Sequence, residues 1–130
     1  MTVLQAVAAV VVLPDEIEFR RVLAAPYPKG GGLRDVLDIE VNGRSLARAL
    51  DAAPFDVDVI RSGNTTAAWS RTGGVVPILN CTCGDIDCGG FYVDVVADDR
   101  TIMWIGAALE RSLAFDRAEF ESSLAAALWG

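Results

Sequence analysis

The sequence predicts an α+β fold, a single domain in which an antiparallel sheet packs against two or three helices. Three observations support this class. Residues 35–41 alternate apolar and acidic side chains, as a half-buried strand does. Two β-rich runs, 91–97 and 101–105, are joined by a short polar turn, which is typical of a hairpin. Residues 116–128 begin with a helix-capping residue and continue with a helical apolar pattern.

From the N-terminus, residues 1–32 are expected to form an arm and residues 33–130 the main body. Residues 3–13 are predicted as a Val-rich strand, and residues 14–25 as a short helix that Pro14 begins. Two prolines and three glycines in residues 26–32 then predict a linker. If the Val-rich strand lies at a sheet edge, it can pair with a second copy of the chain, so a homodimer stays an open alternative.

In the body, Asn42-Gly43 is predicted to form a tight turn, and Ser45 to cap a short helix that ends near Leu50. Residues 55–76 are less regular. Their first apolar residues alternate with aspartates, which favours one strand followed by a long loop. Residues 75–81 are predicted as a further strand.

The C-terminal helix has the clearest start signal. Asp116 is a good N-cap residue, and Glu119 stands three positions later, as in a capping box. Four apolar residues then share one helical face: Phe120, Leu124, Ala127 and Leu128.

Composition excludes several functions. The 130-residue chain has 18 acidic and 11 basic side chains, for a net charge of −7, which argues against nucleic acid or an anionic membrane as the partner. It contains no histidine, so neither a Ser-His-Asp relay nor a His-containing zinc site can form. The apolar run 3–13 is shorter than the roughly 20 residues that span a bilayer, and no basic signal-peptide region precedes it. We therefore expect a non-catalytic, cytoplasmic protein.

All three cysteines lie within eight residues, and this segment carries the candidate site. Glycines at 84, 89 and 90 would let the loop fold back and direct the three sulfurs at one point. The predicted ligands of a structural zinc ion are Cys81, Cys83 and Cys88, with Asp85, Asp87, water or a partner's side chain completing the tetrahedron.

Two alternatives for this loop stay open. The thiols can remain reduced and simply pack, because free cysteine behaves as a small apolar residue. Alternatively, Cys88 can form a disulfide or redox switch with Cys81 or Cys83. The neighbouring aspartates oppose thiolate formation, which argues against redox catalysis.

Three short motifs carry a resemblance. They are Val41-Asn42-Gly43-Arg44 at a strand end, Cys81-Thr82-Cys83-Gly84 in the cysteine loop, and Phe115-Asp116-Arg117-Ala118 at a helix start. With them, residues 35–130 resemble a family of small bacterial proteins that is common in actinobacteria. The resemblance implies this organisation and makes the cysteine loop part of the body, and it implies no activity.

The acidic surface suggests how the protein could act. Seven aspartates are candidates for an acidic face that docks on a basic protein: Asp56, Asp58, Asp85, Asp87, Asp94, Asp98 and Asp99. Trp69, Trp104 and Trp129 are candidate interface anchors, although a strand tryptophan such as Trp104 is typical of a core. The sequence thus favours a bacterial protein-binding module, most concretely an immunity or toxin-neutralising protein. The alternatives are a thiol-based redox protein or enzyme, and a structural homodimer.

Overall fold

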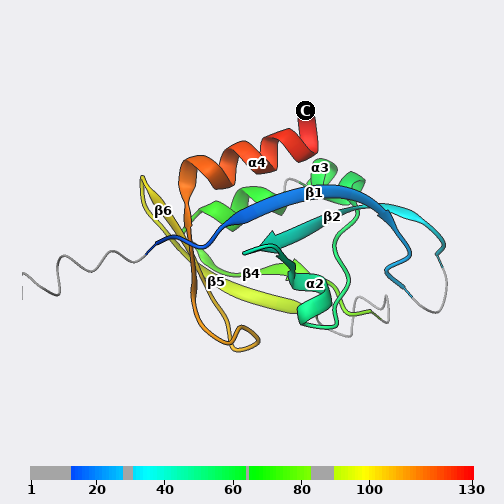
Figure 1. The fold of residues 1–130 in the computed structure, drawn as a ribbon, viewed down its shortest axis with the longest axis horizontal. Coiled ribbons are helices and arrows are strands. Elements are labelled where there is room, and N and C mark those ends of the chain that lie inside the picture. The colour runs from blue at the N-terminus through cyan, green and yellow to red at the C-terminus, as the bar shows by residue number, and fades with distance from the viewer. Residues whose placement is uncertain (1–12, 28–30, 64, 83–89) are drawn as a thin grey trace, which may run out of the picture.

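The computed structural model describes residues 13–27, 31–63, 65–82 and 90–130, and it confirms the predicted α+β class (Figure 1). Its elements, in chain order, are β1 (Ile17–Ala24), β2 (Arg34–Val41), β3 (Arg44–Ser45), α2 (Leu46–Ala49), α3 (Val57–Gly63), the 3-10 helix η1 (Thr65–Ser70), β4 (Gly74–Leu79), β5 (Phe91–Ala97), β6 (Thr101–Ile105), β7 (Leu113–Asp116) and α4 (Arg117–Trp129).

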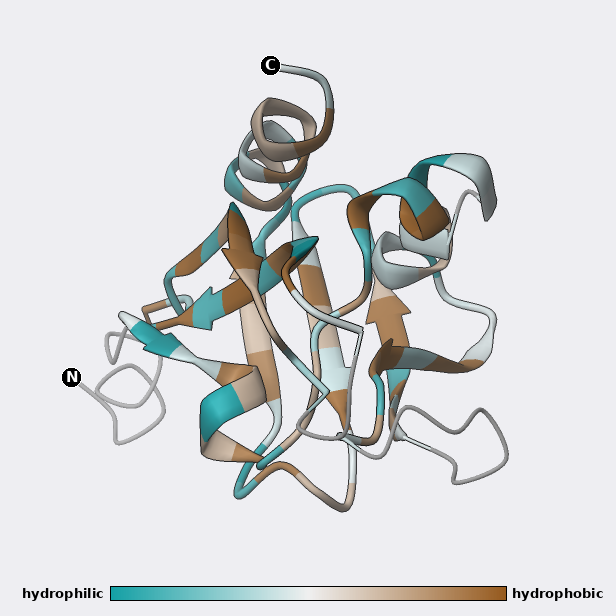
Figure 2. Cartoon of the chain, turned by 90° about the vertical axis from the view of Figure 1, so that its right-hand side faces the viewer, coloured by the Kyte–Doolittle hydropathy of each residue, from teal (hydrophilic) through white to brown (hydrophobic). Residues whose placement is uncertain are grey.

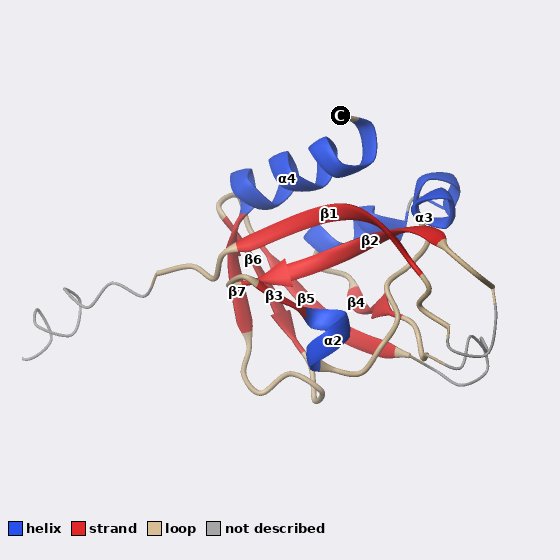
Figure 3. Ribbon diagram, turned by 45° about the vertical axis from the view of Figure 1, so that its right-hand side comes forward, coloured by secondary structure: helices blue, strands red, loops and turns tan. Residues whose placement is uncertain are grey.

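The strands form two antiparallel sheets. One has three strands in the order β1-β2-β3, and the other has four in the order β4-β5-β6-β7 (Figure 3). Helix α4 runs along β1, and the Ser123 hydroxyl accepts a 2.9 Å hydrogen bond from the Phe19 amide. The core lies between the two sheets and the helices α2, α3, η1 and α4, all of which contribute buried residues to it.

The helix predicted at residues 14–25 is wrong, because this segment contains β1. Ile17 and Phe19 alternate with Glu18 and Arg20, so the buried residues repeat every second position. All eight residues of β1 pair with β2, a strand of the predicted body. The predicted linker therefore lies in the connection between two paired strands. The strand predicted at residues 3–13 lies, except for Leu13, outside the described residues.

The turn and short helix that follow β2 are confirmed. Asn42 and Gly43 have φ of 52° and 80°, the left-handed values that a tight hairpin turn between β2 and β3 requires. The Ser45 hydroxyl then caps α2 by accepting from the Arg48 amide at 3.4 Å.

Residues 57–63 form α3 and residues 65–70 form η1, so the strand predicted from residue 55 onward is wrong. Val57 and Ile60, three residues apart, are buried, while Val59 is exposed. This is helical burial, and the apolar–aspartate alternation concealed it. Strand β7 has only four residues and was not predicted.

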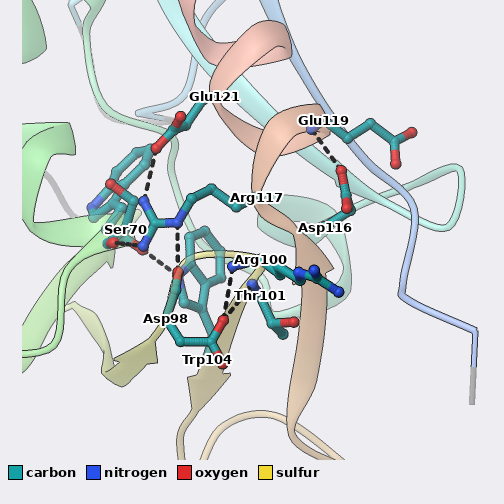
Figure 4. Close-up of polar contacts among 10 residues, drawn as sticks. Ser70, Asp98, Arg100, Thr101, Trp104, Asp116, Arg117, Glu119 and Glu121 are labelled. Carbon is teal, nitrogen blue, oxygen red and sulfur yellow. Dashed lines mark hydrogen bonds and ion pairs between the residues drawn. The ribbon is translucent and has the colours of Figure 1, made fainter.

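The C-terminal helix is confirmed in its start and its face. The Asp116 carboxylate accepts a 3.0 Å bond from the Glu119 amide (Figure 4). Phe120 and Leu128 are buried, and Leu124 and Ala127 pack against the core. Arg117 joins the helix start to two neighbouring segments, since its guanidinium donates to the backbone carbonyls of Asp98 and Ser70.

The centre of the core is aromatic. Phe19, Trp69, Trp104, Phe115 and Phe120 form a chain of ring contacts with centroid separations of 5.0–6.0 Å. These rings come from both sheets, η1 and α4, and each side chain is at most 4% exposed. The prediction that Trp104 belongs to the core is therefore confirmed. Figure 2 shows the corresponding alternation of apolar and polar residues along the strands.

Candidate functional site

The predicted zinc site falls mostly outside the described residues. Cys81 lies two residues beyond the end of β4 and is half-buried, whereas Cys83, Asp85, Asp87 and Cys88 lie in the segment 83–89 that the structure does not describe. Within the described ranges, no group of three or more Cys, Asp or Glu side chains is arranged to hold a metal ion. Zinc coordination by the cysteine loop therefore stays a prediction.

The base of the cysteine loop is well defined. Leu79 and Phe91 pair where β4 and β5 meet, and Asn80 exchanges backbone hydrogen bonds of 2.7 and 2.8 Å with Ala53. Gly90 has a φ of 115°, and a Cβ atom there would lie 2.6 Å from the Leu79 carbonyl oxygen. The chain thus returns to the sheet at a position that only glycine fits, which is the kind of role expected for the loop glycines.

A polar cluster beside this base joins the segment after β1 to Asn80, the residue before Cys81. The Asn80 side-chain amide donates to the Tyr27 hydroxyl at 3.3 Å, and the Arg34 guanidinium lies 5.5 Å from the centre of the Tyr27 ring. Arg34 also donates to Asp56 at 2.6 Å. Hydrogen bonding to Asp56 raises the pKa of Arg34, so this guanidinium keeps its charge and is unsuited to proton transfer near neutrality.

The described members of the predicted acidic face lie on different elements: Asp58 is on α3, Asp94 on β5, and Asp98 and Asp99 in the β5–β6 turn, outside the strands of the larger sheet. Asp56 pairs with Arg34, and the Asp98 carboxylate accepts bonds of 2.9 and 2.8 Å from the amides of Arg100 and Thr101. These backbone bonds lower the pKa of Asp98 (Figure 4). Asp56 and Asp98 are therefore engaged in holding the fold.

Asp15 is a buried carboxylate that sequence reasoning missed. Hydrogen bonding to Arg111, at 2.5 and 3.1 Å, is the main cause that lowers the pKa of Asp15 to about 2, and bonds from Asn42 and the Ala114 amide add to it. Burial opposes the shift. A carboxylate that stays ionised to such low pH cannot serve as a general acid near neutrality. Asp15 instead links the β2–β3 turn to β7.

A groove of about 580 Å³ between β1 and α4 is acidic. It is lined by Glu16, Glu18, Glu40 and Glu119, together with serines of α4. Arg20 pairs with Glu40 at 3.1 Å, and the Ser123 hydroxyl is occupied by the Phe19 amide. The groove thus adds negative charge to this side of the molecule and presents no activated nucleophile.

The second face of the four-stranded sheet is uncovered in the described part of the chain. We call it the outer face, and its residues are Val75, Pro77, Tyr92, Asp94, Val96, Met103, Ile105 and Ala114. The cross-strand register places all of these side chains on the side opposite the buried Val93, Val95 and Trp104. Val75 is 66% exposed, Val96 48%, Tyr92 47% and Ile105 40%.

Asp94 lies at the centre of the outer face. It pairs across the sheet with Val75 on one side and Ile105 on the other, and Tyr92 and Val96 flank it along β5. Among the described residues, its carboxylate has no hydrogen bond and no cation within 4 Å. The alternation of β5 was visible in the sequence, but the neighbouring side chains on β4 and β6 follow only from the strand register.

Of the three candidate interface anchors, two lie in the core and one lies at the surface. Trp69 and Trp104 are at most 1% exposed, so neither can anchor an interface. Trp129 is 69% exposed at the end of α4, where the Arg61 guanidinium lies 5.3 Å from the centre of its ring.

Among the described residues, no helix has the length and apolar character needed to cross a bilayer. Comparison with family models, curated proteins and solved structures finds no match, so a functional assignment rests on the side chains described above.

Proposed function

We propose that this protein is a non-catalytic bacterial module that binds another protein through the outer face. The observation that carries the proposal is the row of exposed apolar side chains on β4, β5 and β6. Exposed apolar side chains that lie close together are favourable to cover, and such groups mark interaction sites in folded proteins.

The outer face is also built on a firm support. The opposite side of the same strands carries Val93, Val95 and Trp104, all at most 1% exposed in the core. The outward side chains are therefore held by strands whose other side is fixed by packing, and little conformational entropy remains to be lost on binding. Preorganisation of this kind lowers the entropic cost of binding a partner.

The charge of the chain supports a basic partner. The net charge of the chain is −7, so a positively charged protein is attracted to it. Opposite charge accelerates association and fixes orientation. An immunity or toxin-neutralising protein acting in the bacterial cytoplasm is the concrete form of this proposal, with the cysteine loop as a structural element that holds zinc.

The test compares two glutamate substitutions at exposed valines. Val96→Glu places a charge in the outer face, and Val59→Glu places the same charge on α3, away from it. In pull-downs from the native host, the wild type and Val59→Glu should retain the same stoichiometric protein, and Val96→Glu should lose it. Equal thermal unfolding of the three proteins shows that the fold is intact. Retention by Val96→Glu, or no partner at any salt concentration, contradicts the proposal.

A further inference from the structure

We infer that the partner places an arginine or lysine side chain on Asp94, with apolar residues around it. This inference rests on the proposed function and specifies the chemistry of its partner. It starts from an unusual juxtaposition, a carboxylate without a described partner that has apolar neighbours across both adjacent strands and along its own strand.

Covering the outer face also takes the Asp94 carboxylate out of water. Directly opposed residues in an antiparallel pair have Cβ atoms only about 5 Å apart, so whatever covers Val75 and Ile105 also covers Asp94. A carboxylate that loses its water without gaining a partner carries a large desolvation penalty. A partner without a cation at this point would therefore bind poorly, whereas one with a cation gains a charged hydrogen bond shielded from water.

The same geometry disfavours a second copy of this chain. In a two-fold symmetric interface centred on the outer face, each residue near the axis meets its own equivalent. Asp94 is central, so two carboxylates would approach each other in an apolar surround, and the repulsion would add to the desolvation cost. Charge complementarity therefore selects a different protein as the occupant.

The outer face also explains the expected specificity. Apolar residues alone would accept many surfaces, because the hydrophobic effect has no direction. A single buried charge rejects every surface that lacks the opposite charge, and specificity often comes from such a penalty. Asp94 thus sets which partner is accepted, and its neighbours supply the buried area.

The test uses a library of short random peptides displayed on phage, selected on the immobilised full-length protein. Asp94→Asn removes the charge and keeps the shape, while Asp99→Asn is the matched control in the nearby β5–β6 turn. Peptides selected on the wild type should carry arginine or lysine between apolar residues. They should bind Asp94→Asn at least about tenfold more weakly, bind Asp99→Asn as the wild type, and fail to bind Val96→Glu.

Each other outcome overturns the inference and separates it from the proposed function. Peptides that bind Asp94→Asn as tightly as the wild type, but not Val96→Glu, leave the outer face as a binding surface and remove the role of Asp94. Peptides without a basic residue, or no enrichment at all, also contradict it. Sedimentation velocity of the wild type completes the test. A dimer that Val96→Glu dissociates would show that a second copy of the chain binds the outer face.

Discussion

The indole nitrogen of Trp104 donates a 2.9 Å hydrogen bond to the backbone carbonyl of Trp69, and the two rings meet edge to face with centroids 6.0 Å apart. Trp69 in turn donates its own indole N–H to the carbonyl of Pro77 at 2.8 Å. Two buried indoles are thus each anchored by their single polar group, which fixes η1 against the four-stranded sheet.

Trp104→Phe should destabilise the protein by about 2 to 4 kcal/mol, because it leaves a buried carbonyl without a donor and opens a cavity. Urea unfolding followed by fluorescence or circular dichroism measures this change. Trp129→Phe, at an exposed site, should change the free energy of unfolding by no more than about 0.5 kcal/mol. Equal effects of the two substitutions would contradict the central position assigned to Trp104.

Asp15 should make the free energy of unfolding depend on pH in the acidic range. Its pKa is lowered in the folded state to about 2 from 3.8, so its contribution is fully present above pH 3.8 and is lost as the pH falls toward 2. The shift corresponds to about 2 kcal/mol at neutral pH. The difference in free energy of unfolding between the wild type and Asp15→Asn should therefore shrink by about 1 kcal/mol between pH 5 and pH 3.

Arg111→Gln is the companion variant for this measurement, because it removes the main cause of the shift and leaves the carboxylate in place. It should flatten the same pH dependence. A gap between the wild type and Asp15→Asn that stays constant over this pH range would show that Asp15 contributes through its shape and not through its charge.

Gly90→Ala should destabilise the protein by about 2 kcal/mol or more, since it forces a side chain into the left-handed region and against the Leu79 carbonyl. Gly73→Ala is the matched control, because a Cβ atom there meets nothing within 4 Å. Thermal unfolding of both variants checks the prediction. If Gly90→Ala unfolds like Gly73→Ala, the close return of the cysteine loop at this point is not important to the fold.

The cysteine loop should bind one Zn²⁺ per chain through Cys81, Cys83 and Cys88. Native mass spectrometry of the reduced protein, with and without a chelator, reports the metal and the number of subunits together. Cys81→Ser should lower the zinc content, and Asp99→Asn should leave it unchanged. An apoprotein after incubation with zinc contradicts the prediction, and a mass lower by two hydrogens without reductant would favour the disulfide alternative.

The sequence predicted best those elements whose signals are local. The β2–β3 turn needs only two residues that accept positive φ, and Asn42 and Gly43 supply them. The start of α4 needs only one capping side chain, which is Asp116. Both features form from contacts a few residues apart, so they can be read before the fold is known.

The errors arose where long-range pairing decides the outcome. Residues 14–16 resemble a helix start, yet the following segment pairs with β2, and burial of Ile17 and Phe19 in the shared core outweighs the local signal. In the segment with Val57 and Ile60, a strand was predicted and a helix forms, because the apolar residues at the start of α3 also fit the alternation of a strand. The outer face required the strand order as well, and no local pattern contains that information.

The bonds between Asp15 and Ala114 have a consequence for how the protein behaves among other molecules. The last strand of the larger sheet would leave the amide and the carbonyl of Ala114 open on its free side, where a strand from another chain can attach and start aggregation. Here the Asp15 amide donates a hydrogen bond to the Ala114 carbonyl, and the Asp15 carboxylate accepts one from the Ala114 amide. Asp15 thus occupies the backbone groups that Ala114 would otherwise offer to a strand of another chain, which disfavours intermolecular pairing at this point of the sheet edge.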